Sequence, residues 1–380
     1  MSRRIACMTA TRADYPRVKS VLREIINRPN LELELIVTGT HLLKEFGYTI
    51  HEIENDGFSI SSQIEMYSND DSPYGMAKAA ARCASGIADT LKDIKPDIFL
   101  LTVDRIETLA AAQSAVYMNI PVAHIQGGEV TGTIDESIRH AVTKLSHIHF
   151  PATIDAGERI IKMGEDPKNV YVVGCPYLDI IRTLEYKTKN ELAKQYGFNL
   201  EKPLIIFIQH PVTTEYGHGV DQIKISIEAL KRFPEAEIIA IYSNADAGGR
   251  EIIATMREFS QFHIFPNIKS EDFLSLMKNA NVMVGNSSTG IREAPSFRLP
   301  VVNIGTRQNG RLCAENVINV PHDIELVAKA IKKSLYDKEF QETVGRVTNP
   351  YGDGFSAKRI VDILENIELS GKLLQKRIKY

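Results

Sequence analysis

The sequence predicts an α/β protein with two domains, each built on a doubly wound parallel sheet with helices on both faces. Three observations lead to this fold class. The chain has 380 residues, which is about twice the size of one ordinary domain. Short, nearly continuous apolar runs alternate with amphipathic stretches, a pattern typical of parallel strands covered on both faces. The alternation stops near residue 176 and restarts near residue 203, so we expect two sheets that face a cleft.

In the first half, apolar runs predict strands over 4–8, 31–37, 97–101, 121–125 and 170–173. Asp14 is the expected cap of the first helix, with Pro16 near its first turn. An Ala-rich helix is expected over 107–116. These elements define a predicted N-terminal Rossmann-like domain, 1–176.

In the second half the same alternation predicts strands over 204–208, 237–242, 282–284 and 301–304. Helices are expected over 222–233, 251–259 and 323–336, and another begins at Ser270. We therefore place a C-terminal Rossmann-like domain at 177–364. The basic, amphipathic end of the chain, 365–380, predicts a helix that packs back on the N-terminal domain rather than a membrane anchor.

Composition excludes several classes of function. The formal net charge is −3, so no general basic field favours nucleic acid as a partner. No apolar run reaches the roughly 18 residues of a membrane helix, and the start of the chain does not read as a signal peptide, so we expect a cytoplasmic protein without a membrane partner. The four cysteines lie far apart and no motif for a metal or a cofactor occurs, so we expect reduced thiols and neither metal nor cofactor.

Polar residues gather after the predicted strands of the N-terminal domain, where open α/β sheets bind ligands. Arginine there can bind phosphate, and carboxylates can move protons. The residues with this potential are Arg12, Asp104, Arg105, Glu129, Asp135 and Arg139, and the amide of Gln126 follows a strand among them. Acidic residues also begin helices without any function, so a structural interpretation of single members stays open.

Two strand ends of the C-terminal domain carry similar signals. His210 follows the strand over 204–208, either as a functional group or as a hydrogen-bonded structural histidine. The segment 285–293 resembles a phosphate cradle, with Ser287 and Ser288 in the turn and Glu293 further along, where it could take two ribose hydroxyls. Arg307 adds a cation after the next strand.

Six motifs occur in a recognisable order: TATRADY at 9–15, VTGTH at 37–41, GGEVTGTIDESIRH at 127–140, HPVTT at 210–214, GNSSTGIRE at 285–293 and GTRQNGR at 305–311. With them the sequence resembles the hydrolysing UDP-N-acetylglucosamine 2-epimerases over nearly its whole length. Non-hydrolysing relatives carry an Ala-Gly-Leu-Arg type of segment after the catalytic strand, so the sequence GGEV at 127–130 favours the hydrolysing branch.

The resemblance implies a fold like the two-domain glycosyltransferase-B enzymes. It implies that UDP-N-acetylglucosamine and water give N-acetylmannosamine and UDP through 2-acetamidoglucal, a step that feeds sialic-acid-type biosynthesis. It assigns the sugar and the catalysis to the N-terminal domain and the UDP-linked nucleotide to the C-terminal one. A homodimer or homotetramer is expected. By motif match, the family's acid/base set corresponds here to Asp104, Asp135 and His210. The family's nucleotide site corresponds to Arg12, Asn244, Ser287, Ser288, Glu293 and Arg307.

One departure from the family concerns Gln126, because many relatives have Glu there. An amide cannot act as a general base, so proton transfer must rest on Asp104, Asp135 or Glu129. Either the proton relay differs, or activity is reduced, or the sugar is another one, such as the UDP- or GDP-linked 2,4-diacetamido-trideoxyhexose of legionaminic acid synthesis. A glycosyltransferase of the same fold and a non-catalytic nucleotide-sugar sensor are the competing hypotheses.

Overall fold

The computed structural model describes residues 2–12, 14–44, 47–68, 70, 73–130, 135–215, 217–243, 248–259 and 261–379, and it leaves out the side chains of 73, 135, 213 and 250. The chain forms two compact units. Unit 1 comprises Met1–Glu129, Ile134–Arg182 and Tyr351–Tyr380, and unit 2 comprises Val130–Thr133 and Thr183–Pro350.

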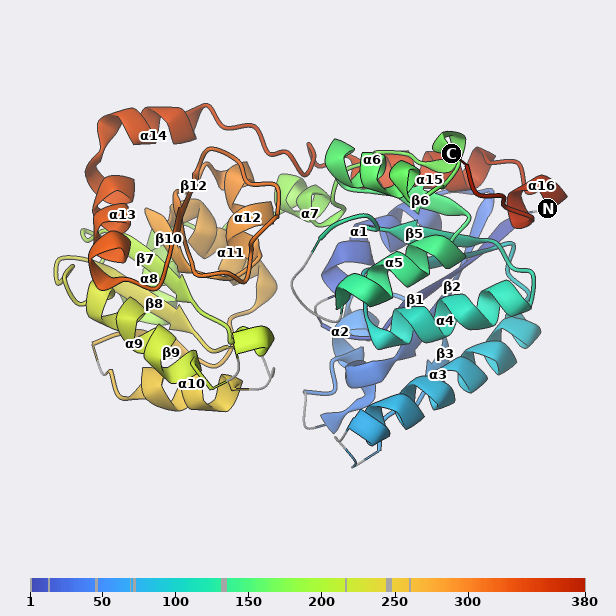
Figure 1. Cartoon of the computed structure of the whole chain (residues 1–380), viewed down its shortest axis with the longest axis horizontal. Coiled ribbons are helices and arrows are strands. Elements are labelled where there is room, and N and C mark those ends of the chain that lie inside the picture. Colours follow the sequence, from blue (N-terminus) through green and yellow to red (C-terminus); the bar gives the residue numbers. More distant parts are fainter. Residues whose placement is uncertain are drawn as a thin grey trace. The chain divides into compact units, whose positions relative to one another are not determined.

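Unit 1 contains a six-stranded parallel sheet with the strand order β3-β2-β1-β4-β5-β6 (Figure 1). Its strands are β1 Arg3–Thr9, β2 Leu31–Thr38, β3 Ile60–Ile64, β4 Ile98–Thr102, β5 Val122–Ile125 and β6 Ile148–Phe150. Its helices are α1 Tyr15–Ile26, η1 Gly39–Leu42, α2 Ile50–Asn55, α3 Pro73–Ile94, α4 Ile106–Tyr117, α5 Asp135–Leu145, α6 Ile154–Lys162, η3 Pro167–Asn169, α7 Tyr177–Thr183, α15 Ser356–Asn366 and α16 Gly371–Leu374.

Alternation along β1 explains why helices cover both faces of this sheet. Ile5 and Cys7 point to one face and pack with α1, α15 and α16, whereas Ala6 and Met8 point to the other and pack with α3, α4 and α5. Figure 1 shows α3, α4 and α5 side by side over that second face. Burial of both faces makes the strand a nearly continuous apolar run.

Unit 2 contains a second six-stranded parallel sheet with the order β12-β11-β10-β7-β8-β9. Counted from its own first strand, this is the same order as in unit 1. Its strands are β7 Leu204–Ile208, β8 Glu237–Ile241, β9 His263–Phe265, β10 Val282–Gly285, β11 Val301–Ile304 and β12 Val317–Val320. Its helices are α8 Lys189–Tyr196, η4 Thr213–Glu215, α9 Gly219–Leu230, α10 Gly249–Arg257, α11 Ser270–Asn279, α12 Thr289–Arg292, η5 Ala294–Phe297, α13 Ile324–Tyr336 and α14 Lys338–Gly345.

The predicted fold class is confirmed, since two parallel sheets carry helices in the expected alternation. The strand predicted over 170–173 is wrong, because only Val170 pairs, in an isolated bridge with His149. At the C-terminus, where the sequence predicts a helix over 365–380, α15 ends at Asn366 and α16 has four residues. Among the helices in the described part of the chain, none is both long and apolar enough to span a membrane.

Candidate active site

The two sheets share one topological feature that places candidate sites. In each, the strand order reverses between two adjacent central strands, which are β1 and β4 in unit 1 and β7 and β10 in unit 2. Ligands of open α/β sheets bind beyond the carboxyl ends of the strands at such a point. The loops that follow these four strands and their neighbours therefore define one candidate site in each unit.

The loop after β1 is folded around the Asp14 carboxylate. This carboxylate accepts hydrogen bonds from the Thr9 hydroxyl at 2.6 Å and from the amides of Ala10 and Thr11 at 3.1 and 3.0 Å. Burial raises the pKa of Asp14 to about 6, and the hydrogen bonds oppose that rise. Asp14 occupies the N-cap position of α1 but does not cap it through its side chain, contrary to the sequence prediction. The side chain shapes the loop on which the exposed Arg12 lies.

The loop after β4 carries a charged network around Asp104. Its carboxylate is bonded to the guanidinium of Arg139, which is almost fully buried. Arg139 also donates to Glu136 Oε2 and to the Glu129 carbonyl, both at 2.9 Å. Burial works against the charge of Arg139, but the nearby carboxylates, Asp104 first, outweigh it and hold its pKa above the ordinary value. The buried Arg139 therefore holds the Asp104 carboxylate in position.

Backbone strain adjoins Asp104. The preceding residue, Val103, has φ 59°, which a β-branched side chain rarely adopts. Its carbonyl lies 2.8 Å from His124 Nε2, and burial is the main cause that lowers the pKa of His124 to about 4. The ring is thus neutral at pH 7, and its Nε2–H donates a hydrogen bond to the Val103 carbonyl. His124 supports the strained turn, and the sequence pattern did not single it out.

Gln126, directly after β5, is a buried amide between two partners. Its Oε1 accepts from Arg17 Nη1 at 3.1 Å, and its Nε2 lies 2.9 Å from Cys175 Sγ. Sequence reasoning missed both partners, because they lie 109 and 49 residues away. The turn continues through Gly128, where a Cβ would lie 2.3 Å from the Ala156 carbonyl, so only glycine fits.

The remaining candidate residues of unit 1 lie in different environments. Glu129 is buried, and Arg105 lies 3.4 Å from the fully buried carboxylate of Glu107, which also accepts a hydrogen bond from Tyr67 at 2.8 Å. Asp135 is the first residue of α5, and its side chain lies outside the described part. Asp104, Glu129 and Arg139 are thus brought together, while Arg105 is turned toward Glu107.

In unit 2, the amide of Asn286 joins the loops that follow β7 and β10. Its Oδ1 accepts from the His210 amide at 2.7 Å, and its Nδ2 donates to the His210 carbonyl at 2.8 Å. Its own carbonyl accepts from Gln308 at 2.8 Å and from Arg307 Nη1 at 3.2 Å. One buried asparagine thereby holds three strand-end loops, and it was not among the predicted site residues.

The turn after β10 has the predicted small residues. Gly285 has φ 126°, and a Cβ there would lie 1.9 Å from the Ile208 carbonyl, so no other residue fits. Ser287 and Ser288 follow, both partly exposed. The helix that begins here, α12, has a single turn. Glu293 is buried just after it.

Arg307 gives the candidate site of unit 2 a positive charge, and His210 lies close to it. Burial, and then the positive charge of Arg307, lower the pKa of His210 to about 3, so its ring is neutral at pH 7. Its Nδ1 lies 3.5 Å from the Ser243 hydroxyl. Asn244, the other predicted nucleotide ligand, lies outside the described residues. Over the described ranges we find no group of three or more His, Cys, Asp or Glu side chains that could hold a metal.

Comparisons with known proteins identify the family. The family model for UDP-N-acetylglucosamine 2-epimerase matches residues 23–365. UDP-N,N'-diacetylbacillosamine 2-epimerase (hydrolyzing) from Legionella pneumophila is 37% identical over 99% of both chains. UDP-N-acetylglucosamine 2-epimerase from Neisseria meningitidis serogroup B is 34% identical over 99% of this chain and 98% of the relative.

Solved structures confirm the fold. The crystal structure of UDP-GlcNAc 2-epimerase from Neisseria meningitidis bound to UDP-GlcNAc superposes with a TM-score of 0.83 at 21% sequence identity, covering 95% of this chain and 99% of that one. The model match spans most of the chain, and the relatives are similar over nearly all of it. This chain belongs to the UDP-N-acetylglucosamine 2-epimerase family.

Proposed function

We propose that this protein is a hydrolysing 2-epimerase that converts UDP-N-acetylglucosamine and water into N-acetylmannosamine and UDP. The observation that carries the proposal is the Asp104 carboxylate, which the buried Arg139 fixes at the carboxyl edge of the unit 1 sheet. Membership of the family supports the epimerase activity. The hydrolysing branch is supported by the name of the Legionella relative and by the GGEV segment at 127–130.

The chemistry explains why a fixed carboxylate is needed. The proton on C2 of the intact sugar is not acidic, so the bond from C1 to the UDP oxygen must break in advance. The oxocarbenium character that develops at C1 acidifies the C2 proton, and a nearby carboxylate stabilises the cation and accepts the proton. Loss of UDP and this proton leaves 2-acetamidoglucal. Water then adds at C1, and a proton returns to C2 from the opposite face.

Within unit 1 we assign the proton transfers to Asp104, Asp135 and Glu129. Arg139, which the sequence suggested as a substrate ligand, becomes a positioning residue, because its donors are used by Asp104, Glu136 and the Glu129 carbonyl. We assign Gln126 no proton transfer, since an amide has no basic site at neutral pH. Arg12 is exposed beside this edge and is assigned to the diphosphate.

Within unit 2 we assign the nucleotide to the loops that Asn286 joins. The guanidinium of Arg307 would stabilise the charge of the departing diphosphate. The hydroxyls of Ser287 and Ser288 can donate to phosphate oxygens, and Glu293 can accept from ribose hydroxyls. We place His210 here too, as a neutral hydrogen-bonding partner of the leaving group, because the pKa of its ring is about 3.

A second sugar is a specific alternative. The relative with 37% identity is named for UDP-N,N'-diacetylbacillosamine, which is a 2,4-diacetamido sugar, and this chain has Gln126 where many relatives of the epimerase family have Glu. The same elimination and hydration would release the 2-epimer of that sugar. Comparing kcat/KM for the two UDP-sugars, under one set of conditions, decides between them.

Turnover in D2O tests the reaction itself. We expect one deuterium at C2 of the released free sugar, detected by mass spectrometry and proton NMR, with no acceptor added. Released sugar without deuterium at C2 would defeat the elimination route. UDP binding without turnover of either UDP-sugar would instead identify a binding protein.

A further inference from the structure

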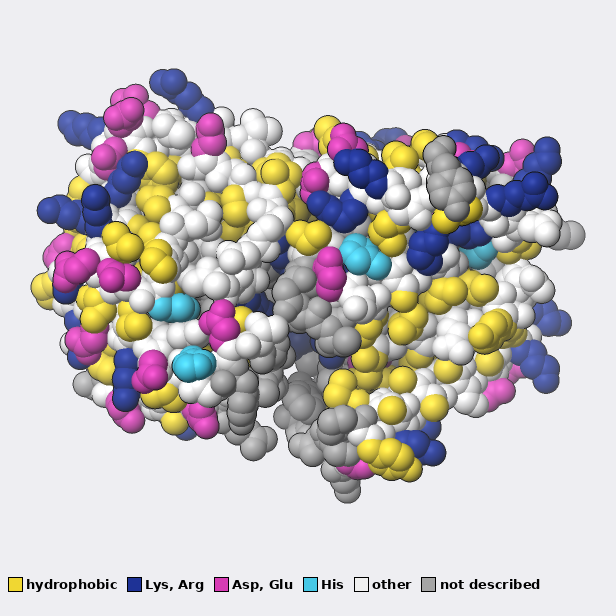
Figure 2. All heavy atoms as spheres, viewed as in Figure 1, with side chains coloured by type: hydrophobic (Ala, Val, Ile, Leu, Met, Phe, Trp, Pro, Cys, Tyr) yellow, Lys and Arg dark blue, Asp and Glu magenta, His cyan; other side chains and the backbone are white. Residues whose placement is uncertain are grey.

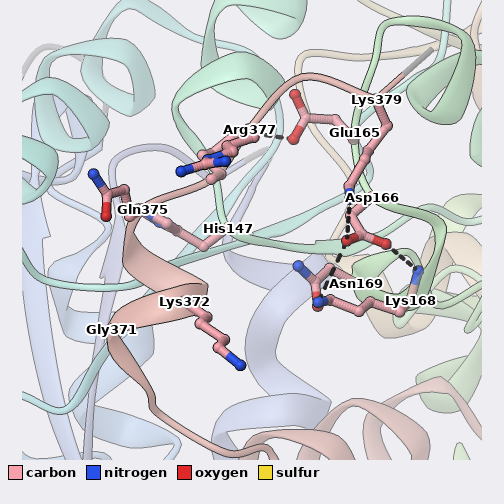
Figure 3. Close-up of a pocket in the computed structure, with 11 residues that line it drawn as sticks. His147, Glu165, Asp166, Lys168, Asn169, Gly371, Lys372, Gln375, Arg377 and Lys379 are labelled. Carbon is pink, nitrogen blue, oxygen red and sulfur yellow. Dashed lines mark hydrogen bonds and ion pairs between the residues drawn. The ribbon is translucent and has the colours of Figure 1, made fainter.

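A pocket lies at the amino ends of the strands of the unit 1 sheet, away from the candidate site at their carboxyl ends. It has a volume of about 380 Å³ and lies wholly within unit 1. His147, at its base, immediately precedes β6, so the pocket lies toward the amino ends of the strands, whereas Asp104 and Gln126 follow strand carboxyl ends. Its lining residues are His147, Glu165, Asp166, Lys168, Asn169, Gly371, Lys372, Gln375, Lys376, Arg377 and Lys379 (Figure 3).

The chain segment that forms one wall of this pocket, 371–379, is held in place by Lys376. Its ammonium group donates to the Glu165 carboxylate at 2.6 Å and to the carbonyls of Lys144 and Ser146 at 2.8 and 2.6 Å. Further along, the Lys379 amide donates to the Gly164 carbonyl at 2.9 Å. The segment 371–379 is therefore attached to the rest of unit 1 at several points.

The acidic groups of the pocket are already neutralised by cations. Burial alone would raise the pKa of Glu165, but hydrogen bonds from His149, Lys144 and Lys376 outweigh it and lower the pKa to about 2. Asp166 lies 3.4 Å from Lys168 and 3.9 Å from Lys379. Figure 3 shows Asp166 with Lys168 and Lys379 on one side of the pocket.

Two cations remain without a carboxylate. Lys372 and Arg377 form no ion pair with any residue in the described ranges, and both are exposed. Five cationic and two acidic side chains line the pocket, a formal excess of three positive charges in a chain whose net charge is −3. Figure 2 shows basic side chains gathered over this region of α6, α15 and the C-terminal segment.

We propose that this pocket binds a sugar phosphate. The volume lies in the usual range for small-molecule pockets, about 300–1,000 Å³. A guanidinium and several ammonium groups around a concave surface match the charge and the fork geometry of phosphate oxygens. The proposal concerns a second site and does not depend on the reaction assigned to the strand-end edge.

Inorganic pyrophosphate is the probe. We expect it to bind the full-length protein in isothermal titration calorimetry with saturating UDP present, so that the proposed nucleotide site is already filled. The double variant Lys372→Glu with Arg377→Glu should raise Kd at least ~10-fold, because two favourable charge contacts become repulsive. Both side chains are exposed, so we expect an unchanged circular dichroism spectrum.

A charge-matched control lies on α3, which is also part of unit 1. The variant Lys78→Glu with Lys92→Glu changes the net charge equally at two exposed positions, and we expect Kd within ~2-fold of the parent value. Hydrogen exchange should locate the effect, with protection by pyrophosphate over 371–379 in the parent and none in the pocket variant.

Three results would overturn the proposal: no pyrophosphate binding by the parent, equal weakening by both double variants, or protection confined to residues outside the pocket. Sedimentation with phosphatidylserine vesicles separates a membrane surface from a soluble phosphate. Vesicle binding without pyrophosphate binding would likewise reject the proposed ligand class.

Discussion

The strand-end edges of the two units share one topology but differ in chemistry. At the edge of unit 1, charged groups are paired, and one member of each pair is buried: the buried Arg139 bonds to Asp104 and Glu136, and the buried Glu107 lies near Arg105. At the edge of unit 2, a neutral amide joins the loops, and the guanidinium of Arg307 lies close to it. The side chain of Asn286, in the loop after β10, bonds to the amide and the carbonyl of His210, in the loop after β7, and the His210 ring is neutral.

The difference teaches what each edge can do. A buried guanidinium fixes the position of a carboxylate, which suits a group that must meet a sugar carbon in one geometry. A neutral amide that holds backbone loops leaves a surface of N–H groups and hydroxyls, which suits a ligand that supplies its own negative charge. We therefore attribute chemistry to the unit 1 edge and nucleotide binding to the unit 2 edge, and four predictions test that division.

The largest effect is expected for Asp104→Asn. The change keeps the shape of the side chain but removes its basicity, so kcat should fall ~10²- to 10⁴-fold while the Kd for UDP changes less than ~2-fold. Arg139 keeps Glu136 and the Glu129 carbonyl as partners, so the fold should persist. Steady-state kinetics and UDP titration measure the two quantities.

The control for Asp104→Asn is Asp97→Asn, which lies immediately before β4 at the other end of the same strand, where Asp97 accepts a hydrogen bond from the Arg4 amide at 2.8 Å. Its kcat should stay within ~2-fold of the parent, because the site is remote from the carboxyl edge. If Asp104→Asn weakened UDP binding as much as it slowed turnover, the separation of roles would fail.

The next prediction compares the stability cost of placing a carboxylate at two buried glutamines, which lie at strand ends, one in each unit. Gln126→Glu places a carboxylate beside Arg17 and the Cys175 thiol, so we expect the free energy of unfolding to change by less than ~1 kcal/mol. Gln209 is fully buried and accepts from the Ser226 hydroxyl at 2.6 Å, with no cation bonded to it in the described ranges. Gln209→Glu should therefore cost ~3 kcal/mol or more.

Urea unfolding monitored by circular dichroism compares the two glutamine variants. Equal losses would mean that the Arg17 contact does not compensate a charge at position 126. The same Gln126→Glu protein, assayed with both UDP-sugars, also reports whether a carboxylate restored at this position changes the preference between them.

Much of this comparison could be predicted from sequence, because apolar runs locate buried strands and the residues after them fall at the strand ends. The strand over 204–208 and the polar groups at 104, 126 and 210 were found in this way. The strand predicted over 170–173 failed because a short apolar run does not distinguish a strand from an extended segment with one bridge.

Partners distant in the chain could not be predicted. Local periodicity does not show that Arg139 is almost fully buried and donates to Asp104, or that Cys175 lies beside Gln126. Asn286 lay inside a segment identified as a phosphate cradle, yet its role as a clamp depends on where the β7 loop passes. Such roles are set by tertiary packing, which a single sequence does not encode locally.

A smaller effect is expected for Arg307→Ala. A charge-assisted hydrogen bond to a diphosphate is lost, so the Kd for UDP should rise ~10- to 100-fold. Arg346→Ala, at an exposed position of unit 2, is the control and should leave Kd within ~2-fold. Unchanged affinity in the Arg307 variant would remove this arginine from the nucleotide site.

The smallest effect is expected for His210→Ala, which distinguishes a neutral from a charged histidine at the nucleotide site. With a pKa of about 3, caused by burial and by Arg307, the ring is neutral between pH 5.5 and 8 and offers UDP one neutral hydrogen bond, worth about 0.5–1.5 kcal/mol. His210→Ala should therefore raise the Kd for UDP only ~3- to 10-fold, by nearly the same factor at every pH in this range. The phosphate of UDP titrates as well, so the ratio of Kd values, variant over parent, is the quantity to follow. If that ratio grew steeply as the pH fell through 6.5, His210 would be binding as a cation, and the unit 2 edge would offer UDP a second positive charge beside that of Arg307.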